Sequence, residues 1–287
     1  MRASLVIFTD LDATLLDEET FCHKAAAPAL QELRLAGASL ILCTGRTRAE
    51  VEPLHRELGL TAPFVFENGG GIVIPATARG WRAPLVARGG GPLVIPLGTP
   101  HAALVVALRE ISAETGWRLV GLSDLTIDQV AERTGMSRAA ASLAATREFD
   151  EPFVMESSHP GATGEARVAV ARAAERRGLR VTSGGRFHHL TGPVDKGKAV
   201  RQLLGLHEGP LFSLALGDSA NDLTMLQAVD RAVIVPRPDG SWSETLLGGL
   251  PHARRAPCPG PRGWNEAVLS ELREIPPREE EGETAAW

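Results

Sequence analysis

Residues Leu5 to Asp17 read LVIFTDLDATLLD. The apolar run at the start of this stretch has the length of a strand buried in a parallel sheet, and it ends in Asp10 and Asp12. Ligands bind beyond the carboxyl ends of such strands, so both carboxylates are predicted to lie at the mouth of a crevice. Carboxylates this close raise the pKa of one of them unless a cation neutralises the pair, and Mg²⁺ prefers such oxygen ligands. The alternative is a plain turn after the strand, because Asp favours turns.

The composition narrows the classes of protein that fit. With 287 residues, 44% of them hydrophobic, the chain can bury one large core or two modest ones. It has no apolar run long enough to span a bilayer and no signal-peptide pattern, and its three cysteines are widely spaced, which favours neither disulfides nor a zinc site. A net charge of -5 argues against a general nucleic-acid binder. We therefore expect a cytoplasmic protein without a membrane or nucleic-acid partner.

Lysine is scarce in this chain. Lys24, Lys196 and Lys198 are its only lysines, whereas arginine supplies the other basic residues. Lysine is a compact point charge that arginine does not reproduce at a tight site. Two lysines within three positions therefore mark a candidate site, although Lys198 is also compatible with an ordinary surface charge.

A β/α alternation follows the opening strand. The predicted strands are 5–8, 39–43 and 63–66, and the predicted helices between them are 25–36 and 48–58. Successive β-then-α units favour a parallel, doubly wound sheet of the Rossmann-like α/β class. Polar or glycine residues follow each strand, so the three strand ends are predicted to meet at one crevice.

The pattern changes after Ile74 and returns near Lys196. Between about residues 93 and 186, short strands separated by helices predict a small α+β domain inserted into the first one. The expected division is core 1–85, inserted domain 86–186, core 187–275, and a disordered acidic tail 276–287.

The strand ends carry groups suited to phosphoryl chemistry. A transferred phosphoryl group needs a nucleophile, a cation and donors for its equatorial oxygens. A carboxylate can be the nucleophile and a second carboxylate the general acid and base, while Thr44 offers a hydroxyl and Lys196 a charge. Asp218 is predicted to complete a Mg²⁺ shell with Asp10.

Four short motifs resemble, in order, those of the haloacid dehalogenase superfamily. They are DLDAT at 10–14, Thr44 after a strand, KG at 196–197 and GDSAND at 217–222. The resemblance implies that Asp10 is the nucleophile, that Asp12 is the general acid and base, and that Thr44 and Lys196 hold the phosphoryl group. It also implies that Mg²⁺ is bound by Asp10, Asp218 and the Asp12 carbonyl, and that the insertion is a substrate-reading cap. Asp222 is expected either to bind the metal or to cap the following helix, and Ala13 stands where glycine is usual.

Further segments are similar to the mannosyl-3-phosphoglycerate phosphatases. They are ENGGG at 67–71, REFDEPF at 147–153, GGRFHH at 184–189, DKGK at 195–198 and GPRGWN at 260–265. This resemblance implies hydrolysis of mannosyl-3-phosphoglycerate, a step in compatible-solute synthesis. The residues expected to bind substrate are Gly45, Arg46, Asn68, Gly69, Arg147, Glu151, Ser183, Arg186, His188 and Asn221. Among them the arginines suit a carboxylate or phosphate, and Glu151 or His188 suits sugar hydroxyls.

Three alternatives remain open at this point. The substrate could be another sugar phosphate, such as glucosyl-3-phosphoglycerate or sucrose phosphate. The reaction could be a phosphotransfer of the mutase type. A non-catalytic binding protein is disfavoured because every expected catalytic position is filled. The expected partner is a small phosphorylated glycoside, and the sequence makes no prediction of oligomeric state.

Overall fold

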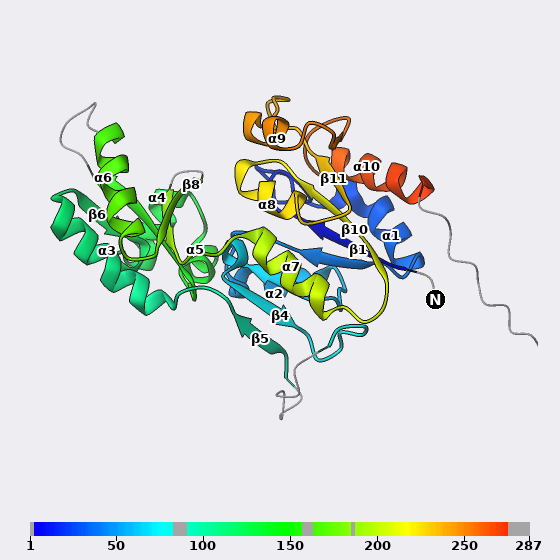
Figure 1. The fold of residues 1–287 in the computed structure, drawn as a ribbon, viewed down its shortest axis with the longest axis horizontal. Coiled ribbons are helices and arrows are strands. Elements are labelled where there is room, and N and C mark those ends of the chain that lie inside the picture. The colour runs from blue at the N-terminus through cyan, green and yellow to red at the C-terminus, as the bar shows by residue number, and fades with distance from the viewer. Residues whose placement is uncertain (1–2, 83–90, 157–162, 185–186, 275–287) are drawn as a thin grey trace, which may run out of the picture. The chain divides into compact units, whose positions relative to one another are not determined.

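The computed structural model describes residues 3–82, 91–156, 163–184 and 187–274. The chain forms two compact units (Figure 1). The first comprises Met1–Ile41, Gly80–Arg82 and Leu204–Trp287, and the second comprises Leu42–Arg79 and Ala83–Leu203. We describe each unit by itself. Among the described helices, none has the length and apolarity that crossing a bilayer requires.

The first unit is built on a five-stranded sheet in the order β12-β11-β10-β1-β2. Its strands are β1 (Ser4–Thr9), β2 (Ser39–Leu42), β10 (Leu211–Gly217), β11 (Arg231–Ile234) and β12 (Arg254–Arg255). The pairs β1–β10, β10–β11 and β11–β12 are parallel. Side chains at the centre of β1 and β10, among them Ile7, Phe8 and Leu214, are fully buried, as in a sheet covered on both faces. The prediction of an α/β fold with a parallel sheet is confirmed.

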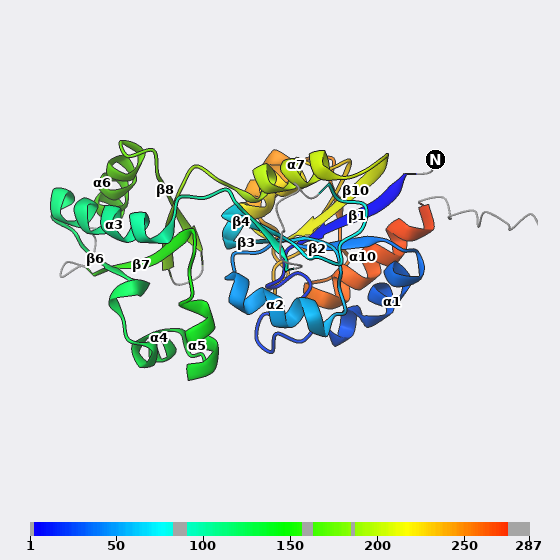
Figure 2. The same ribbon diagram turned by 90° about the horizontal axis from the view of Figure 1, so that it is seen from below.

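Helices on this sheet include η1 (Lys24–Ala26), α1 (Ala27–Leu35), α8 (Leu223–Leu226), α9 (Glu244–Gly249) and α10 (Gly260–Glu274). Helices α1 and α10 lie side by side in both ribbon views (Figures 1 and 2). They are joined by a hydrogen bond from the backbone N–H of Ala29 to Asn265 Oδ1 at 2.8 Å. Next to Asn265, Trp264 is fully buried against the sheet. The motif at 260–265 therefore attaches the last described helix to the parallel sheet.

The second unit contains a three-stranded antiparallel sheet of β3 (Phe64–Phe66), β4 (Gly71–Ile74) and β5 (Leu93–Pro96). Strand β3 was predicted to continue the parallel pattern of the preceding strands, but its ladder in this sheet is the antiparallel one with β4. Only residues 67–70 separate these two strands, and a parallel pair needs a crossover of a dozen or more residues. A single parallel bridge between Cys43 and Val65 is the part of the predicted pairing that forms.

A four-stranded antiparallel sheet follows in the same unit, in the order β6-β7-β9-β8. Its strands are β6 (Arg118–Gly121), β7 (Asp150–Glu156), β8 (Arg180–Gly184) and β9 (Phe187–Thr191). Helices α3 (His101–Thr115) and α6 (Thr163–Glu175) cover one face of it, where Leu104 and Val170 pack against Phe153 (Figure 2). This is the α+β arrangement predicted for the inserted segment, with β9 as a strand that the sequence did not reveal.

Further helices complete the described part of the second unit. They are α2 (Arg48–Glu57), η2 (Glu67–Gly69), η3 (Leu122–Asp124), α4 (Ile127–Thr134), α5 (Arg138–Ala144) and α7 (Lys196–Leu206), the last of which continues into the first unit. Thr47, predicted as the N-cap of α2, forms a capping box with Glu50. Thr126 and Ser137 are the N-caps of α4 and α5, and each side chain accepts a hydrogen bond from a backbone N–H in the first turn of its helix.

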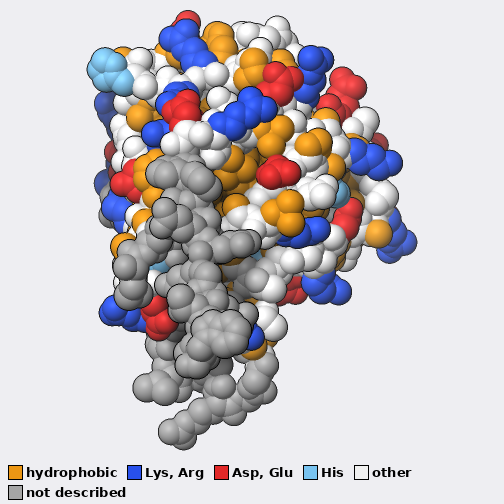
Figure 3. All heavy atoms as spheres, turned by 90° about the vertical axis from the view of Figure 1, so that its right-hand side faces the viewer, with side chains coloured by type: hydrophobic (Ala, Val, Ile, Leu, Met, Phe, Trp, Pro, Cys, Tyr) orange, Lys and Arg blue, Asp and Glu red, His pale blue; other side chains and the backbone are white. Residues whose placement is uncertain are grey.

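The predicted domain borders stay predictions. Residues 42–79 and 187–203, expected in the core, group with the insertion in the second unit. The acidic tail 276–287 lies outside the described residues. On the face shown in Figure 3, basic and acidic side chains are interspersed. That face, as far as it is described, lacks the continuous basic stripe of a nucleic-acid binder.

Candidate active site

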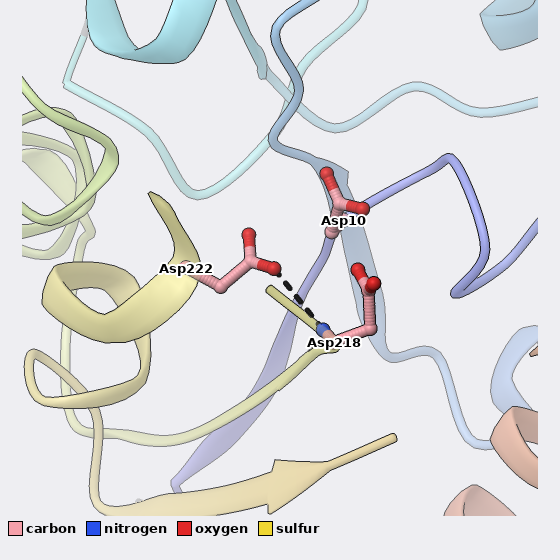
Figure 4. A group of neighbouring side chains, drawn as sticks. All are labelled: Asp10, Asp218 and Asp222. Carbon is pink, nitrogen blue, oxygen red and sulfur yellow. Dashed lines mark hydrogen bonds between the residues drawn. The ribbon is translucent and has the colours of Figure 1, made fainter. Parts of the chain in front are cut away.

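Three buried carboxylates meet at one edge of the parallel sheet. Asp10 directly follows β1 and Asp218 directly follows β10, and these two strands are parallel neighbours. Asp222 reaches the same place from the end of η4 (Ala220–Asp222) (Figure 4). One oxygen from each carboxylate lies within 4.8 Å of the others. The predicted meeting of side chains at the strand ends therefore occurs within the first unit for Asp10, Asp218 and Asp222.

The donor set of this cluster fits a divalent cation. Three buried carboxylates repel one another and lose hydration, so their charged forms need a compensating positive charge. Hard carboxylate oxygens are the ligands that Mg²⁺ prefers, with waters and substrate phosphate in the remaining positions. Asp10, Asp218 and Asp222 are thus the residues of the first unit that would hold Mg²⁺.

The loop after β10 is fixed by the same carboxylates. Asp222 Oδ2 accepts hydrogen bonds from the backbone N–H groups of Asp218 at 3.1 Å and Ser219 at 3.0 Å. Thr14 Oγ1 donates to Asp218 Oδ1 at 3.3 Å. A Cβ at Gly217 would lie 2.6 Å from Asp222 Cγ, so only glycine lets the Asp222 side chain approach the strand end. Thr14 and Gly217 were not predicted as site residues.

Asp12 and Ala13 form the turn beyond the nucleophile candidate. Asp12 is half-buried, and its carboxylate is not one of the three that gather in the described part of the chain. The expected roles of Asp12, metal contact through its carbonyl and proton transfer by its carboxylate, stay predictions. Ala13 has a φ of 59°, in the left-handed region where alanine is strained. The departure from the usual glycine is therefore a real backbone cost.

A buried hydrogen-bond chain supports the end of β1. Trp264 Nε1 donates to Thr9 Oγ1 at 3.0 Å, and Thr9 Oγ1 donates to the carbonyl of Asp10 at 2.7 Å. All three residues are buried. The chain fixes the backbone at the residue that carries the candidate nucleophile, which is a role for Trp264 that no sequence motif revealed.

Thr44 and Lys196 both lie in the second unit and are buried there, with exposed fractions of 1% and 0%. A fully buried lysine is rare without a partner or a function. Gly69, at a φ of 95°, lies against the start of α7, since a Cβ there would be 2.3 Å from the Asp195 carbonyl. The backbone N–H of Asn68 donates to the Thr44 carbonyl at 2.9 Å. The segments carrying Thr44, Gly69 and Lys196 therefore lie close together.

Glu67 sits in a strained turn of the same region. Glu67 and Asn68 have φ values of 48° and 53°, which non-glycine residues rarely adopt. The buried Glu67 carboxylate accepts the backbone N–H groups of Glu148 at 3.0 Å and Phe149 at 2.6 Å. Burial raises the pKa of Glu67 to about 7, although Arg147 and these N–H groups act in the opposite direction. Glu67 thus ties the turn after β3 to the segment that enters β7.

Arg147 is already engaged within the second unit. Its Nη1 donates to the Gly45 carbonyl at 3.0 Å and to Asp150 Oδ2 at 3.1 Å, and its Nε donates to the Ala144 carbonyl. The side chain is only 10% exposed. Its expected contact with a substrate anion remains a prediction, and the structure adds a second role as a link between Gly45 and β7.

Glu151 and His188 were expected to contact sugar hydroxyls, which stays a prediction, and the structure gives both side chains other contacts. The fully buried Glu151 accepts the backbone and hydroxyl of Ser123 on Oε1 and the His101 ring on Oε2. The His188 ring lies 5.5 Å from Phe153, on the face that α3 and α6 cover. Burial and the nearby Arg167 lower the pKa of His188. Both side chains therefore serve the interior of this sheet.

The other predicted substrate residues have mixed placements. Arg186 lies outside the described residues, and Ser183 is described only as a β8 backbone position paired with His188. Arg46 is half-buried, and its backbone N–H donates to Thr44 Oγ1 at 3.2 Å. Asn221 Oδ1 accepts the Ser219 hydroxyl at 2.6 Å, beside Asp222 in the first unit. These residues stay predictions as substrate contacts.

Comparisons with known proteins agree with this geometry. Residues 7–79 match the family model of the haloacid dehalogenase-like hydrolases. The chain is 39% identical over 267 residues to the glucosyl-3-phosphoglycerate/mannosyl-3-phosphoglycerate phosphatase of Methanococcoides burtonii, covering 92% of this chain and 96% of that protein. It is 34% identical over 232 residues to the mannosyl-3-phosphoglycerate phosphatase of Pyrococcus furiosus, covering 80% and 90% respectively.

A solved structure supports the fold. A haloacid dehalogenase-like hydrolase from Bacteroides thetaiotaomicron has a TM-score of 0.63 at 16% identity, covering 94% of this chain and 100% of that one. At this identity the likeness concerns the fold alone. The family model and the two phosphatase relatives, which cover 92% and 80% of the chain, show that the chain belongs to the haloacid dehalogenase-like hydrolases and is a phosphatase of that family.

Proposed function

We propose that this phosphatase hydrolyses the phosphate ester of mannosyl-3-phosphoglycerate and, as a second substrate, that of glucosyl-3-phosphoglycerate. The names of the relatives from Methanococcoides burtonii and Pyrococcus furiosus support this class of substrate. The buried Asp10, Asp218 and Asp222 cluster at the strand ends supports phosphoryl chemistry. That cluster is the single observation that carries the proposal, because a glycoside-binding protein without catalysis would not need it.

In the proposed first step, a carboxylate oxygen of Asp10 attacks the phosphorus. The bond to the glycerate oxygen breaks as Asp12 donates a proton to that oxygen, and the products are the glycosylglycerate and an aspartyl-phosphate. In the second step, Asp12 takes a proton from water, whose oxygen attacks the phosphorus. Inorganic phosphate leaves and Asp10 is regenerated.

We assign Thr44 and Lys196 to the phosphoryl oxygens. A hydroxyl donor and an ammonium group are suited to the charge that three equatorial oxygens spread during transfer. Mg²⁺ held by Asp10 and Asp218 would neutralise the repulsion between the nucleophile and the anionic substrate. Gly69 supports this assignment within the second unit, since it lets its turn approach the start of α7.

Phosphate release from four substrates tests the proposal. The purified chain is assayed with mannosyl-3-phosphoglycerate, glucosyl-3-phosphoglycerate, sucrose phosphate and p-nitrophenyl phosphate, each with Mg²⁺ and with EDTA. We expect the two phosphoglycerates to give the highest kcat/KM and EDTA to abolish turnover. A preference for sucrose phosphate would contradict the substrate, and phosphoryl transfer to a second sugar without free phosphate would indicate a mutase.

The nucleophile is tested separately. Asp10→Asn removes the attacking charge while keeping the side-chain shape, so we expect no measurable turnover on any of the four substrates. Full activity of this variant would show that the assignment of Asp10 is wrong. Trapping of phosphate on the wild-type chain, and not on the variant, would identify the covalent step directly.

A further inference from the structure

Two adjacent histidines of β9 point to opposite faces of the four-stranded sheet. Successive side chains of a strand alternate between faces. The His188 ring lies 5.5 Å from the buried Phe153 ring, on the face that α3 and α6 cover. His189, paired with Pro152 in the register, therefore lies on the other face.

His189 is held on that face by a buried carboxylate. Its Nδ1 lies 2.8 Å from Asp150 Oδ2, and Asp150 is fully buried whereas the His189 side chain is 18% exposed. A carboxylate at this distance accepts the Nδ1–H and leaves Nε2 at the outer end of the ring. Among the described residues, no hydrogen bond to Nε2 is found. The ring is thus oriented at one end and presents a polar atom at the other.

The same carboxylate connects His189 to the segment that carries Thr44. Asp150 Oδ2 also accepts Arg147 Nη1 at 3.1 Å, and Arg147 donates to the Gly45 carbonyl at 3.0 Å. His189 is therefore separated from Gly45, the neighbour of Thr44, by only two side chains. The link lies entirely within the second unit.

Asp150 has a further unusual feature. Its Oδ1 atom is buried and has no hydrogen-bond partner within the described part of the chain. A buried acceptor without a partner costs about 1–3 kcal/mol, so such atoms usually mark a place where a ligand or water donates. On the face that carries His189, Nε2 is therefore the polar atom able to meet a hydroxyl group of a ligand, whereas Asp150 Oδ1 is enclosed beneath it.

We propose that His189, with Asp150 as its positioning residue, is the histidine that hydrogen-bonds a hydroxyl of the glycosyl part of the substrate. The inference rests on the proposed function, since it presumes a phosphorylated glycoside. The ring suits this task because Nε2 can form a hydrogen bond with a hydroxyl while Nδ1 stays on Asp150. This assigns to His189 the recognition that the sequence suggested for His188.

The choice of replacement separates recognition from structure. In His189→Asn the amide nitrogen takes the place of Nδ1 and keeps the Asp150 contact, but nothing reaches the place of Nε2. In His189→Gln the amide lies near the place of Nε2 and the Asp150 contact is lost. Recognition predicts that Gln retains more activity than Asn, and a merely structural role of His189 predicts the reverse.

The experiment measures kcat/KM for the phosphorylated glycoside that the wild type hydrolyses fastest and for p-nitrophenyl phosphate, which has no glycosyl part. For His189→Asn we expect about a tenfold loss on the glycoside, mainly through KM, as for one lost hydrogen bond to a neutral group, and no change on p-nitrophenyl phosphate. His189→Gln should lose less on the glycoside. His188→Asn is the matched control and should leave the ratio of the two substrates unchanged.

Two outcomes overturn the inference. One is an equal loss of kcat/KM on both substrates in His189→Asn. The other is a lowered ratio of kcat/KM for the glycoside to kcat/KM for p-nitrophenyl phosphate in His188→Asn but not in His189→Asn. The unchanged aryl phosphate activity also shows that each variant is folded. Failure of the proposed function looks different, because the wild type itself would then release no phosphate from either glycosyl-3-phosphoglycerate. The histidine comparison is still made on whichever glycoside it does hydrolyse.

Discussion

The Asp222 carboxylate accepts the backbone N–H of Asp218 at 3.1 Å, so one member of the acidic cluster holds the main chain that carries another. Asp222 therefore combines the two roles that the sequence presented as alternatives, a cap of the loop before α8 and a member of the cluster. The Asp218 carboxylate, which accepts the Thr14 hydroxyl at 3.3 Å, is proposed as a direct metal ligand. This difference predicts different consequences of neutralising the two residues.

Asp222→Asn should raise the Mg²⁺ concentration for half-maximal phosphate release by about tenfold or more, because losses of supporting groups weaken metal binding by that order. Asp218→Asn should abolish activity at every Mg²⁺ concentration, because a direct ligand is lost. A Mg²⁺ titration of phosphate release measures both. An unchanged titration curve for Asp222→Asn would show that Asp222 acts as a helix cap and does not contribute to metal binding.

Gly217→Ala should disturb the cluster by contact alone. The new Cβ would lie 2.6 Å from both Cβ and Cγ of Asp222, so the Asp222 side chain must move. We expect at least about a tenfold loss of kcat/KM and a destabilisation of about 1–3 kcal/mol, typical of overpacking. Gly205→Ala is the control, since no atom lies within 4 Å of its added Cβ. An active, stable Gly217→Ala protein would contradict the described position of Asp222.

Ala13→Gly should stabilise the protein. Alanine at a φ of 59° is strained by about 1–2 kcal/mol. Glycine relieves this strain, but its greater conformational freedom in the unfolded chain offsets part of the gain. The net gain of about 1 kcal/mol corresponds to a rise in Tm of about 3 °C for a chain of this size. Ala139→Gly, at an exposed position within α5, is the matched comparison and should lower Tm. Equal losses in both variants would mean that the turn is not left-handed.

Glu67 should make the stability depend on pH. The folded chain holds the Glu67 proton up to a pKa of about 7, whereas the unfolded chain releases it near the ordinary value of 4.5. The folded state therefore binds more protons in this interval, and the free energy of unfolding falls as pH rises through it, by at most about 1.4 kcal/mol per pH unit. Above about pH 7 this contribution no longer changes with pH.

Urea unfolding of the wild type and of Glu67→Gln at several pH values between about 5 and 8 measures this effect. The glutamine variant lacks the titrating proton, so its stability should fall less steeply with pH. Identical slopes for the two proteins would show that Glu67 is ionised in the folded state throughout this range. Glu148→Gln, which changes a more exposed carboxylate of the same neighbourhood, is the control.

The sequence predicted the parts of the site that depend on strand ends. Asp10 and Asp218 follow apolar runs directly, and parallel neighbours place their ends together, so the cluster required no knowledge of side-chain packing. The β3 prediction was met only by one parallel bridge, between Cys43 and Val65, because a run such as 64–66 does not reveal which strands it pairs with. Its ladder is with β4, which follows after a short turn.

The faces of the four-stranded sheet on which His188 and His189 lie could not be predicted, for a different reason. An alternation argument needs a recognised strand, and Phe187–Thr191 was not recognised as one. Without its register, His188 and His189 are equivalent, although the fold buries one under α3 and α6 and ties the other to Asp150. Trp264 is similar, since its hydrogen bond to Thr9 joins residues from opposite ends of the chain.

The hydrogen bond between Trp264 and Thr9 gives the protein a built-in optical reporter. The chain has five tryptophans and no tyrosine, so its near-ultraviolet fluorescence comes from indole rings alone. The Trp264 side chain is fully buried. Its indole N–H donates to Thr9, the residue that precedes Asp10, the proposed attacking carboxylate. A change in charge at Asp10 would act on this indole through a low-dielectric interior and shift its emission. If Asp10 carries the covalent phosphate as proposed, stopped-flow fluorescence should therefore follow its formation and loss without an attached dye.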